Sequence, residues 1–419
     1  MTKNNAENFF GLGLAPKLLE IIEKNNFIKP TPIQAQTIPI AITGKDVVGI
    51  AQTGTGKTLA FGLPMMQNIA RQKTRGLILV PTRELAAQVD EVLMSFGRSL
   101  GLITAVVVGG ASEAQQRRAL QRKPHIIVAT PGRLIDHLSS NKTLLENIGI
   151  LTLDEADRML DMGFAPQIDK ILARMTKKRQ TLLFSATMPQ SITAIANKYM
   201  HTPLRIEIAK PGTVVKEVDQ EVIFLGQGEK LPMLKKLLEN YHGSVLVFSR
   251  TKHGAKRLAN SIRNMDHTSA DISANRSLSQ RKAAIDGFKK GRFRILVATD
   301  IAARGIDVRN IEVVVNYDLP STPDDYVHRI GRTARAGKRG KAISFATADQ
   351  QKDVLAIERF INVQMTKGRT GNLPQPMPQH KSQVRPPQRR NQSLGKYHNH
   401  RSSRRNGRRD YSQRRRKKR

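Results

Sequence analysis

A glycine-rich loop, AQTGTGKT at residues 51–58, constrains the fold of this chain more than any other feature. It lies between an apolar run at 46–51, typical of a buried strand, and an apolar stretch at 59–70, typical of a helix. The backbone N–H groups of such a loop and the Lys57 ammonium suit a triphosphate, and the Thr58 hydroxyl suits Mg²⁺. The loop departs slightly from the general pattern, because Ala51 stands where the first glycine usually does.

A second motif, LTLDEAD at 151–157, follows the loop about a hundred residues later. An apolar strand that ends in two carboxylates supplies a partner for Mg²⁺, Asp154, and a candidate base for water, Glu155. The ends of strands are where open α/β sheets bind their ligands. An acidic helix start is the more ordinary explanation of such a pair. The loop upstream favours nucleoside triphosphate hydrolysis instead.

Short apolar runs alternate with amphipathic stretches, which indicates parallel sheets covered by helices on both faces. The first set of expected strands lies at 46–51, 76–80, 103–108, 125–130, 150–155 and 181–187. The second set lies at 218–225, 244–249, 293–299, 312–318 and 341–347. We therefore expect an α/β chain with two tandem domains, 1–208 and 217–366. The linker between them, 209–216, contains a Pro-Gly pair that breaks any regular element.

The charge of the chain is unevenly distributed. Lys and Arg number 70 against 34 Asp and Glu, a net charge of +36. Residues 367–419 hold 18 of the basic residues and one acid, Asp410. This segment has no apolar periodicity and cannot bury enough surface to fold alone, so we expect a disordered basic tail. Such a tail suits an electrostatic tether for nucleic acid, with a solubilising surface as the alternative.

The composition also excludes several kinds of site. The chain has no Cys, which rules out disulfides, thiolate metal sites and Cys nucleophiles. No apolar run approaches the roughly 20 residues that span a bilayer, and the N-terminus lacks the pattern of a secretory signal. We expect a cytoplasmic protein with no membrane partner.

An arginine cluster, HRIGRTAR at 328–335, lies in the second domain, which has no phosphate loop of its own. Arg329, Arg332 and Arg335 are spaced three apart and so share roughly one helix face or turn. A surface patch is one interpretation. Charge stabilisation delivered across a cleft between the domains, as an arginine finger, is the other and explains the cluster better.

Motif for motif, the chain resembles the DEAD-box ATP-dependent RNA helicases over about residues 9–365. Its compact core and basic tail look most like the bacterial RhlE-type subgroup. The resemblance implies two RecA-like domains, ATP and Mg²⁺ as cofactors, and an RNA-dependent ATPase. Such an enzyme unwinds short RNA duplexes or remodels RNA–protein complexes. The candidate pathways are ribosome assembly and RNA decay. The candidate partners are ribosomal particles or the RNA-decay machinery, and we expect the chain to be a monomer.

The resemblance assigns an ATP site residue by residue. FIKPTPIQ at 27–34 matches the adenine-reading motif, so Phe27 would stack on the base and Gln34 would bond its edge, with Phe10 as the upstream aromatic. The other implied ATP contacts are Thr53, Gly54, Thr55, Gly56, Lys57, Thr58, Gly305 and Asp307. Mg²⁺ would be held at Thr58 and Asp154. The implied catalytic residues are Lys57, Asp154, Glu155, Arg332 and Arg335.

The resemblance also assigns RNA contacts and residues that couple the domains. The implied RNA-binding residues are Pro81, Thr82, Arg83, Gly110, Thr130, Gly132, Arg133, Arg250 and Thr299. The implied coupling residues are Asp157, Ser185, Thr187, His328 and Arg329. Independently of the family, glycines let backbone amides approach phosphates closely. Aromatic residues are only 5% of the chain and Trp is absent, which argues against base stacking and favours sequence-independent backbone recognition.

Two departures from the family pattern concern the second domain. Ala334 stands in HRIGRTAR where the family usually has glycine. In SANRSLSQR at 273–281, the residues Ser273, Ala274 and Leu278 replace the His, Gly and Gln of relatives, while Arg281 is retained. The second departure affects the expected RNA contacts and leaves the ATP site untouched.

Two other functions are compatible with part of the sequence. A DNA-directed ATPase motor shares the architecture, but the adenine-reading motif, the DEAD sequence and the SAT motif at 185–187 argue against it. A non-catalytic basic RNA chaperone would need only the tail. A chaperone needs none of Lys57, Glu155 and Arg335, so their presence favours the helicase.

Overall fold

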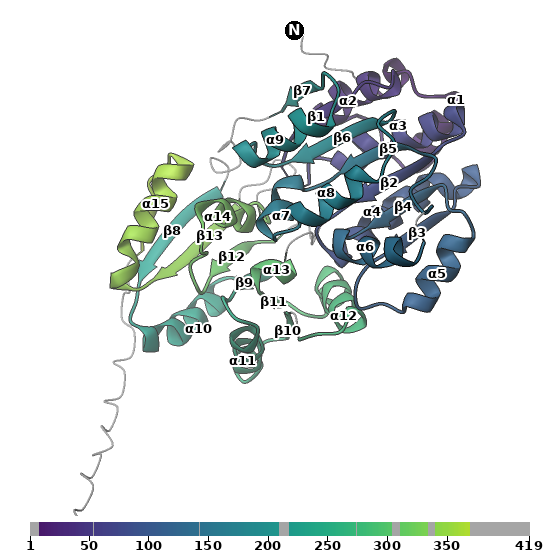
Figure 1. Cartoon of the computed structure of the whole chain (residues 1–419). Helices are drawn as coiled ribbons and strands as arrows, with labels where there is room; N and C mark the ends of the chain where they lie inside the picture. Colours follow the sequence, from purple (N-terminus) through teal and green to yellow (C-terminus); the bar gives the residue numbers. More distant parts are fainter. Residues whose placement is uncertain are drawn as a thin grey trace, which may run out of the picture. The chain divides into compact units, whose positions relative to one another are not determined.

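The computed structural model describes residues 8–52, 54–141, 143–208, 218–273, 275–303, 311–333 and 340–368. These residues belong to one compact unit that extends over 1–374. They form two parallel sheets of seven strands each, and we call residues 8–208 the first lobe and residues 218–368 the second lobe (Figure 1).

The first lobe is built on a sheet with strand order β3-β4-β2-β5-β6-β1-β7, and all neighbouring strands are parallel. Its strands are β1 (Val47–Ile50), β2 (Arg75–Leu79), β3 (Thr104–Val107), β4 (Ile126–Ala129), β5 (Ile148–Leu153), β6 (Gln180–Ser185) and β7 (Leu204–Glu207). Because side chains alternate along a strand, Leu77 and Leu79 pack on one face of the sheet and Ile78 on the other. Such strands are buried on both faces, which explains their apolar runs.

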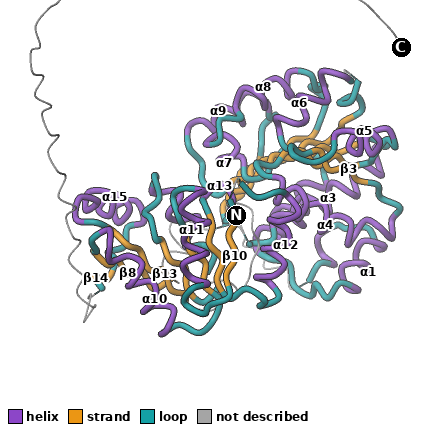
Figure 2. The backbone as a smooth tube through the Cα atoms, turned by 90° about the horizontal axis from the view of Figure 1, so that it is seen from below, coloured by secondary structure: helices purple, strands orange, loops and turns teal. Residues whose placement is uncertain are grey.

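Two layers of helices cover this first sheet. One face is packed by α1 (Pro16–Lys24), α2 (Pro32–Ile42), α3 (Lys57–Gln72) and α4 (Arg83–Gly97). The other is packed by α5 (Glu113–Gln121), α6 (Pro131–Ser140), α7 (Ala156–Asp161), α8 (Ala165–Ala173) and α9 (Gln190–Tyr199). Figure 2 shows both layers, with the strands between them.

The second lobe repeats this plan with strand order β10-β11-β9-β12-β13-β8-β14, again all parallel. Its strands are β8 (Val218–Phe224), β9 (Val245–Phe248), β10 (Ser269–Ile272), β11 (Ile295–Ala298), β12 (Val313–Asn316), β13 (Gly340–Ala346) and β14 (Thr366–Lys367). One face is packed by α10 (Lys230–Asn240) and α11 (Lys252–Arg263). The other is packed by α12 (Leu278–Lys289), α13 (Asp300–Ala303), α14 (Pro323–Ile330) and α15 (Gln351–Ile361).

The expected fold class, an α/β chain with two tandem parallel sheets covered by helices, is confirmed. Every strand that the apolar runs indicated is present, with ends within a few residues of those expected. Three strands had no such signal: β7, β10 and β14. All three lie at sheet edges. An edge strand can form from a short or alternating sequence such as LRIE or SADI, so these strands lack an apolar run.

Some expectations concern other parts of the chain. The linker at 209–216 and the basic tail beyond residue 368 lie outside the described residues, and the domain boundaries stay predictions. Within the described ranges, no helix has both the length and the apolar character needed to cross a bilayer.

Candidate functional site

The order of strands in the first sheet sorts the motifs into two groups. The phosphate loop, LTLDEAD and SAT follow β1, β5 and β6, which are neighbours in the order β5-β6-β1. PTRELA, Gly109-Gly110 and TPGR follow β2, β3 and β4, which are neighbours in the order β3-β4-β2. Because all strands are parallel, both groups lie along one edge of the sheet, side by side. The tertiary structure thus separates the predicted ATP contacts from the predicted RNA contacts.

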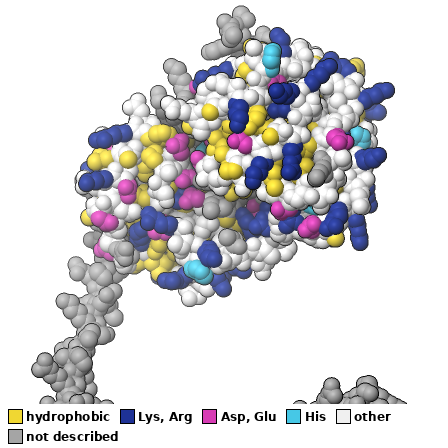
Figure 3. Space-filling view, in the orientation of Figure 1, with side chains coloured by type: hydrophobic (Ala, Val, Ile, Leu, Met, Phe, Trp, Pro, Cys, Tyr) yellow, Lys and Arg dark blue, Asp and Glu magenta, His cyan; other side chains and the backbone are white. Residues whose placement is uncertain are grey.

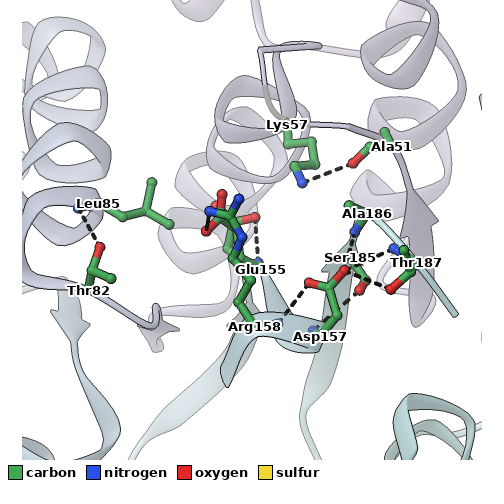
Figure 4. A network of polar contacts seen from close by, with 11 residues as sticks. Ala51, Lys57, Thr82, Leu85, Glu155, Asp157, Arg158, Ser185, Ala186 and Thr187 are labelled. Atoms are coloured by element: carbon green, nitrogen blue, oxygen red, sulfur yellow. Dashed lines mark hydrogen bonds and ion pairs between the residues drawn. The ribbon is translucent and has the colours of Figure 1, made fainter. Parts of the chain in front are cut away.

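The phosphate loop holds its lysine in a buried position. Lys57 is the first residue of α3 and its Nζ donates to the Ala51 carbonyl over 2.9 Å (Figure 4). The side chain is almost fully enclosed, at 6% exposure. The Thr55 hydroxyl donates to the Gln52 carbonyl over 2.7 Å. The ammonium therefore lies at the start of a helix, where backbone amides and the helix dipole also favour an anion.

Gly56 connects the phosphate loop to the adenine-reading motif. Its backbone is left-handed, with φ of 90°, and its carbonyl accepts from Gln34 Nε2 at 3.0 Å. The Gln34 Oε1 accepts from the backbone N–H of Thr31 at 2.9 Å, which closes the start of α2. A Cβ at position 56 would overlap Gln34 Nε2 and lie 3.1 Å from Thr31 Oγ1. Only glycine fits this approach without displacing Gln34.

The first two carboxylates of LTLDEAD directly follow β5 and are both buried, at 3% exposure for Asp154 and 4% for Glu155. Burial raises the pKa of Asp154 to about 6, although the Lys57 ammonium opposes the shift. The Asp154 Oδ1 accepts from the Glu155 N–H at 3.0 Å. Glu155 has φ of 52°, a left-handed conformation that is strained for a residue with a Cβ. Such strain is characteristic of functional sites.

Asp157 links this turn to the SAT motif. Its Oδ2 accepts from the Ala186 N–H at 3.0 Å, the Thr187 N–H at 2.9 Å and the Thr187 hydroxyl at 3.1 Å (Figure 4). Its own N–H donates to Ser185 Oγ at 3.3 Å. Burial raises the pKa of Asp157, but His328, Lys57, Arg158 and the Thr187 N–H outweigh burial and hold that pKa below its usual range. The structure therefore brings Asp157 together with three other residues that the resemblance assigned to coupling, Ser185, Thr187 and His328. It does not bring Arg329 to them, because its hydrogen bonds are to Asp300, Asn316 and Asp318 of its own lobe.

The predicted RNA contacts lie at helix starts and tight turns. Thr82 caps α4, and its Oγ1 accepts from the Leu85 N–H at 3.2 Å. Arg83 extends across Gly110, whose φ of 73° and lack of a Cβ permit the contact. Arg133 lies 3.3 Å from Asp136, and two of its buried nitrogens, Nε and Nη1, have no hydrogen-bond partner among the described residues. Helix N-termini, glycine turns and arginines are the groups that bind phosphates without reading bases.

Thr130, Gly132 and Thr299 lie at helix starts, and Arg250 lies on the surface of the second lobe. Thr130 is the residue before α6 and Gly132 lies in its first turn, after Pro131. In the second lobe, the Thr299 carbonyl accepts from the N–H groups of Ala302 and Ala303. Arg250 is exposed, and its N–H donates to Asp318 Oδ2 at 2.9 Å.

The arginine cluster of the second lobe divides into residues with different environments. Arg329 is 2% exposed, and its guanidinium bonds both oxygens of Asp300 at 2.6 and 2.7 Å, the Asn316 side chain and the Asp318 carbonyl. It also lies over the Phe248 ring. These contacts all lie within the second lobe. Arg332 follows the end of α14 and lines a small cavity with His328 and, from the first lobe, Arg158.

The segment that departs from the family pattern has contacts of its own. Arg276 forms a bidentate pair with the buried Asp271, one bond being 3.1 Å from Nε to Oδ2. Ser277 and Gln280 form a capping box at the start of α12. The retained Arg281 pairs with Glu84 of the first lobe at 3.0 Å, and both side chains are buried. This segment is therefore ordered by local pairs, and it meets PTRELA through one ion pair between the lobes.

The aromatic residues of the predicted adenine site are exposed. Phe10 is 66% exposed and Phe27 is 40% exposed. One side of the Phe27 ring packs on Phe96, with 5.5 Å between the ring centroids. Thr53, Gly305, Asp307, Arg335, Ala274 and Ala334 lie outside the described residues, so their assigned roles stay predictions.

The sequence analysis assigned no role to three residues that make contacts at this site: Arg158, Glu84 and Arg281. Arg158 follows LTLDEAD directly and is 1% exposed, with Nη1 bonded to Glu155 Oε2 at 2.8 Å. A charge three residues after another on a helix was the available signal, since such a pair is adjacent in space. Glu84 lies inside PTRELA, and Arg281 is the residue of 273–281 that matches the family pattern. Their ion pair joins the two lobes, so neither local sequence indicates it.

The donors for Mg²⁺ fit a hard cation. A hydroxyl at Thr58 and a carboxylate at Asp154 are oxygen ligands of the kind that Mg²⁺ takes in proteins. Asp154 lies near two further acids, Glu155 and Asp157, which raise its pKa together with burial, so a cation would stabilise its charged form. Among the described residues, no cluster of three or more acidic or His side chains could hold a metal unaided. Phosphates and water would complete the coordination.

The surface of the described residues is rich in basic side chains. Figure 3 shows Lys and Arg spread over the visible face of both lobes, with acidic side chains between them. No single basic patch dominates that view. The strongest concentration of positive charge is in the sequence beyond residue 368.

Comparisons with known proteins match both lobes. A family model described as DEAD/DEAH box helicase matches residues 31–195, and one described as Helicase conserved C-terminal domain matches residues 229–337. The chain is 43% identical over 365 residues to the ATP-dependent rRNA helicase RRP3 of Candida albicans, which covers 86% of this chain and 68% of that protein. The RRP3 protein of Debaryomyces hansenii is 42% identical, with 86% and 76% covered.

Among solved structures, the chain is similar to S. cerevisiae Dbp5 bound to RNA and ADP BeF3. The TM-score is 0.79 at 33% identity, and the match covers 87% of this chain and 96% of that one. The similarity therefore extends over most of the chain and is not confined to one lobe.

Proposed function

Because this chain belongs to the DEAD/DEAH box helicase family and is an ATP-dependent RNA helicase, we propose that ribosomal RNA is its substrate and ribosome assembly its pathway. The observation that carries this proposal is the 43% identity over 365 residues to a protein named as an rRNA helicase. The basic segment beyond residue 368 supports it, since long structured RNA is a dense polyanion. Placement in the RhlE-type subgroup, a role in RNA decay, a monomeric state and a cytoplasmic location stay predictions.

In the proposed mechanism, the chain binds ATP along β1, β5 and β6 and RNA along β2, β3 and β4. Lys57 and the amides at the start of α3 would hold the phosphates, and Asp154 with Thr58 would hold Mg²⁺, which would neutralise the phosphate charge. Glu155 orients and deprotonates the attacking water. Arg332 and Arg335 stabilise the charge that develops on the transferred phosphoryl group. Asp157, through SAT, couples this site to the binding of RNA.

A variant that binds without turnover tests the substrate. The full chain with Glu155→Gln would be expressed in cells and crosslinked to RNA there. The RNA bound to it would then be sequenced. We expect ribosomal RNA precursors to be enriched above their share of total RNA. Enrichment of messenger RNA alone would favour decay and would contradict the assembly proposal.

The first biochemical prediction concerns the sugar of the nucleic acid. ATP hydrolysis should be strongly stimulated by single-stranded RNA and not by DNA of the same sequence, because the 2′-OH distinguishes the two at a site. The measurement is steady-state hydrolysis with no nucleic acid, with RNA and with DNA. Equal stimulation by both strands would move the proposal to a DNA motor. Absence of hydrolysis in all three conditions would leave the chaperone interpretation.

The second prediction concerns the basic tail. Deletion of residues 369–419, which keeps β14 (Thr366–Lys367) and removes nearly all of the basic segment, should weaken RNA binding and flatten its dependence on salt. Each lost phosphate contact reduces the slope of log K against log salt by about one. RNA affinity of the full and shortened chains would be measured from low to high salt. If both chains give the same slope, the tail is not an RNA tether.

A further inference from the structure

A buried arginine that the proposed mechanism leaves without a role lies next to the predicted base. Arg158, in α7, is 1% exposed, and its Nη1 donates to Glu155 Oε2 over 2.8 Å (Figure 4). The Glu155 side chain is 5% exposed. Among the described residues, no hydrogen bond is made to the other carboxylate oxygen, Oε1. The ion pair thus fixes one oxygen of Glu155, while the other has no hydrogen bond among the described residues.

The same arginine is connected to the SAT motif through its backbone. The Arg158 N–H donates to Asp157 Oδ1 at 2.9 Å. The other oxygen of that carboxylate, Oδ2, accepts the three hydrogen bonds from Ala186 and Thr187. A continuous series of contacts therefore leads from SAT to Asp157, to Arg158 and to the Glu155 carboxylate.

Arg158 also lies at the boundary with the second lobe. It lines a small cavity of about 10 Å³, whose other walls come from the second lobe and include Phe248, Asp300 and Arg332. Its Nε and Nη2 are buried and have no hydrogen-bond partner among the described residues. Both oxygens of Asp300 are bonded to Arg329. Arg158 of the first lobe thus lines the same cavity as Arg329 and Arg332 from the arginine cluster of the second lobe.

Stability does not explain this arrangement. A buried ion pair is often no more stable than apolar side chains of the same volume, because desolvation of both charges offsets their attraction. Leaving two guanidinium nitrogens without acceptors adds a further cost. The left-handed backbone of Glu155 is an additional strain at the same turn. Three unfavourable features around one carboxylate indicate that its position matters more than its stability.

We propose that Arg158 is a positioning residue for Glu155, which holds Oε2 so that Oε1 is directed at the attacking water. The proposal rests on the proposed role of Glu155 as the base. Because the Arg158 N–H bonds Asp157 and Asp157 bonds SAT, a movement of SAT would change the position of the Glu155 carboxylate. Because Arg158 also lines a cavity with residues of the second lobe, the position of Glu155 would depend on that lobe too. Arg158 itself contacts neither ATP nor RNA in this scheme.

The test uses the full chain with Arg158→Met, which keeps the length and removes the charge, and with Arg158→Lys, which keeps the charge and one donor. Misplacing a catalytic group by about 1 Å costs on the order of 100-fold in rate. We expect kcat to fall by about 10- to 100-fold in the Met variant, with KM for ATP and half-saturating RNA within about twofold of the parent. The Lys variant should recover part of kcat. Arg118→Met, at an exposed position of α5, is the control.

A double variant separates positioning from a merely structural role. If Arg158 acts only through Glu155, adding Arg158→Met to Glu155→Gln should not reduce the residual single-turnover rate further. The double variant removes both buried charges, so its Tm should be at least that of Arg158→Met alone. A further drop of the same size as in the parent chain would overturn the proposal, because Arg158 would then act independently.

Two outcomes distinguish this proposal from the proposed function. If Glu155→Gln is inactive while Arg158→Met keeps parental kcat, the positioning role is wrong and the base assignment stands. If Glu155→Gln keeps parental turnover, the base assignment itself is wrong. Loss of ATP binding and of Tm in parallel with kcat, without recovery in Arg158→Lys, would identify Arg158 as structural only.

Discussion

Replacing Glu155 with Gln should abolish multiple-turnover ATP hydrolysis while ATP and RNA still bind. The side chain is nearly isosteric, and the site keeps Lys57, Asp154 and the loop amides that would hold the phosphates. General base catalysis contributes about 10²–10⁴-fold, so kcat should fall by at least about 100-fold. The measurement is RNA-stimulated hydrolysis together with equilibrium binding of a fluorescent ATP analogue and of labelled RNA.

Glu23→Gln is the matched control, since Glu23 lies exposed on α1 of the same lobe. It should leave both hydrolysis and binding at parental values. Unchanged turnover in Glu155→Gln would remove the role assigned to Glu155. Loss of ATP binding with turnover would instead show that the carboxylate maintains the structure of the site.

Replacing Gly56 with Ala should weaken ATP binding strongly. An L residue in the left-handed region costs about 1–2 kcal/mol, and φ at position 56 is 90°. The new Cβ would also overlap Gln34 Nε2, so the contact between the adenine-reading motif and the phosphate loop would be broken. Since every 1.4 kcal/mol is about tenfold in affinity, we expect KM for ATP to rise by about tenfold or more.

Gly228→Ala is the control for backbone effects, because a Cβ there would meet nothing within 4 Å and its φ is not positive. It should leave KM for ATP unchanged. In the Gly56 variant, RNA binding without nucleotide should also be unchanged, because the RNA-binding loops follow other strands. A normal KM in Gly56→Ala would mean that Gln34 and the loop can separate freely.

The sequence by itself determined the fold class and the chemistry of the ATP site. Apolar runs gave the interior strands because strands of a parallel sheet are buried on both faces and admit few polar residues. The phosphate loop was readable because its function requires specific residue types, such as Lys57 and glycines with left-handed backbone, in a fixed order. The edge strands β7, β10 and β14 gave no such signal, since an edge strand needs no continuous apolar sequence.

Only the tertiary structure decided which of these residues act on one another. The order β3-β4-β2-β5-β6-β1-β7 separates the RNA loops from the ATP loops along one sheet edge, and no local pattern encodes strand order. Burial decided that Arg329 is bonded within its own lobe, whereas the spacing of HRIGRTAR treats its arginines alike. The contact of Arg158 with Glu155 is local, but the link from Asp157 to SAT joins two chain segments that meet only when the sheet forms. The chemistry of a site requires particular residue types, which a local sequence motif shows. Contacts between distant segments result from packing, and no local motif shows them.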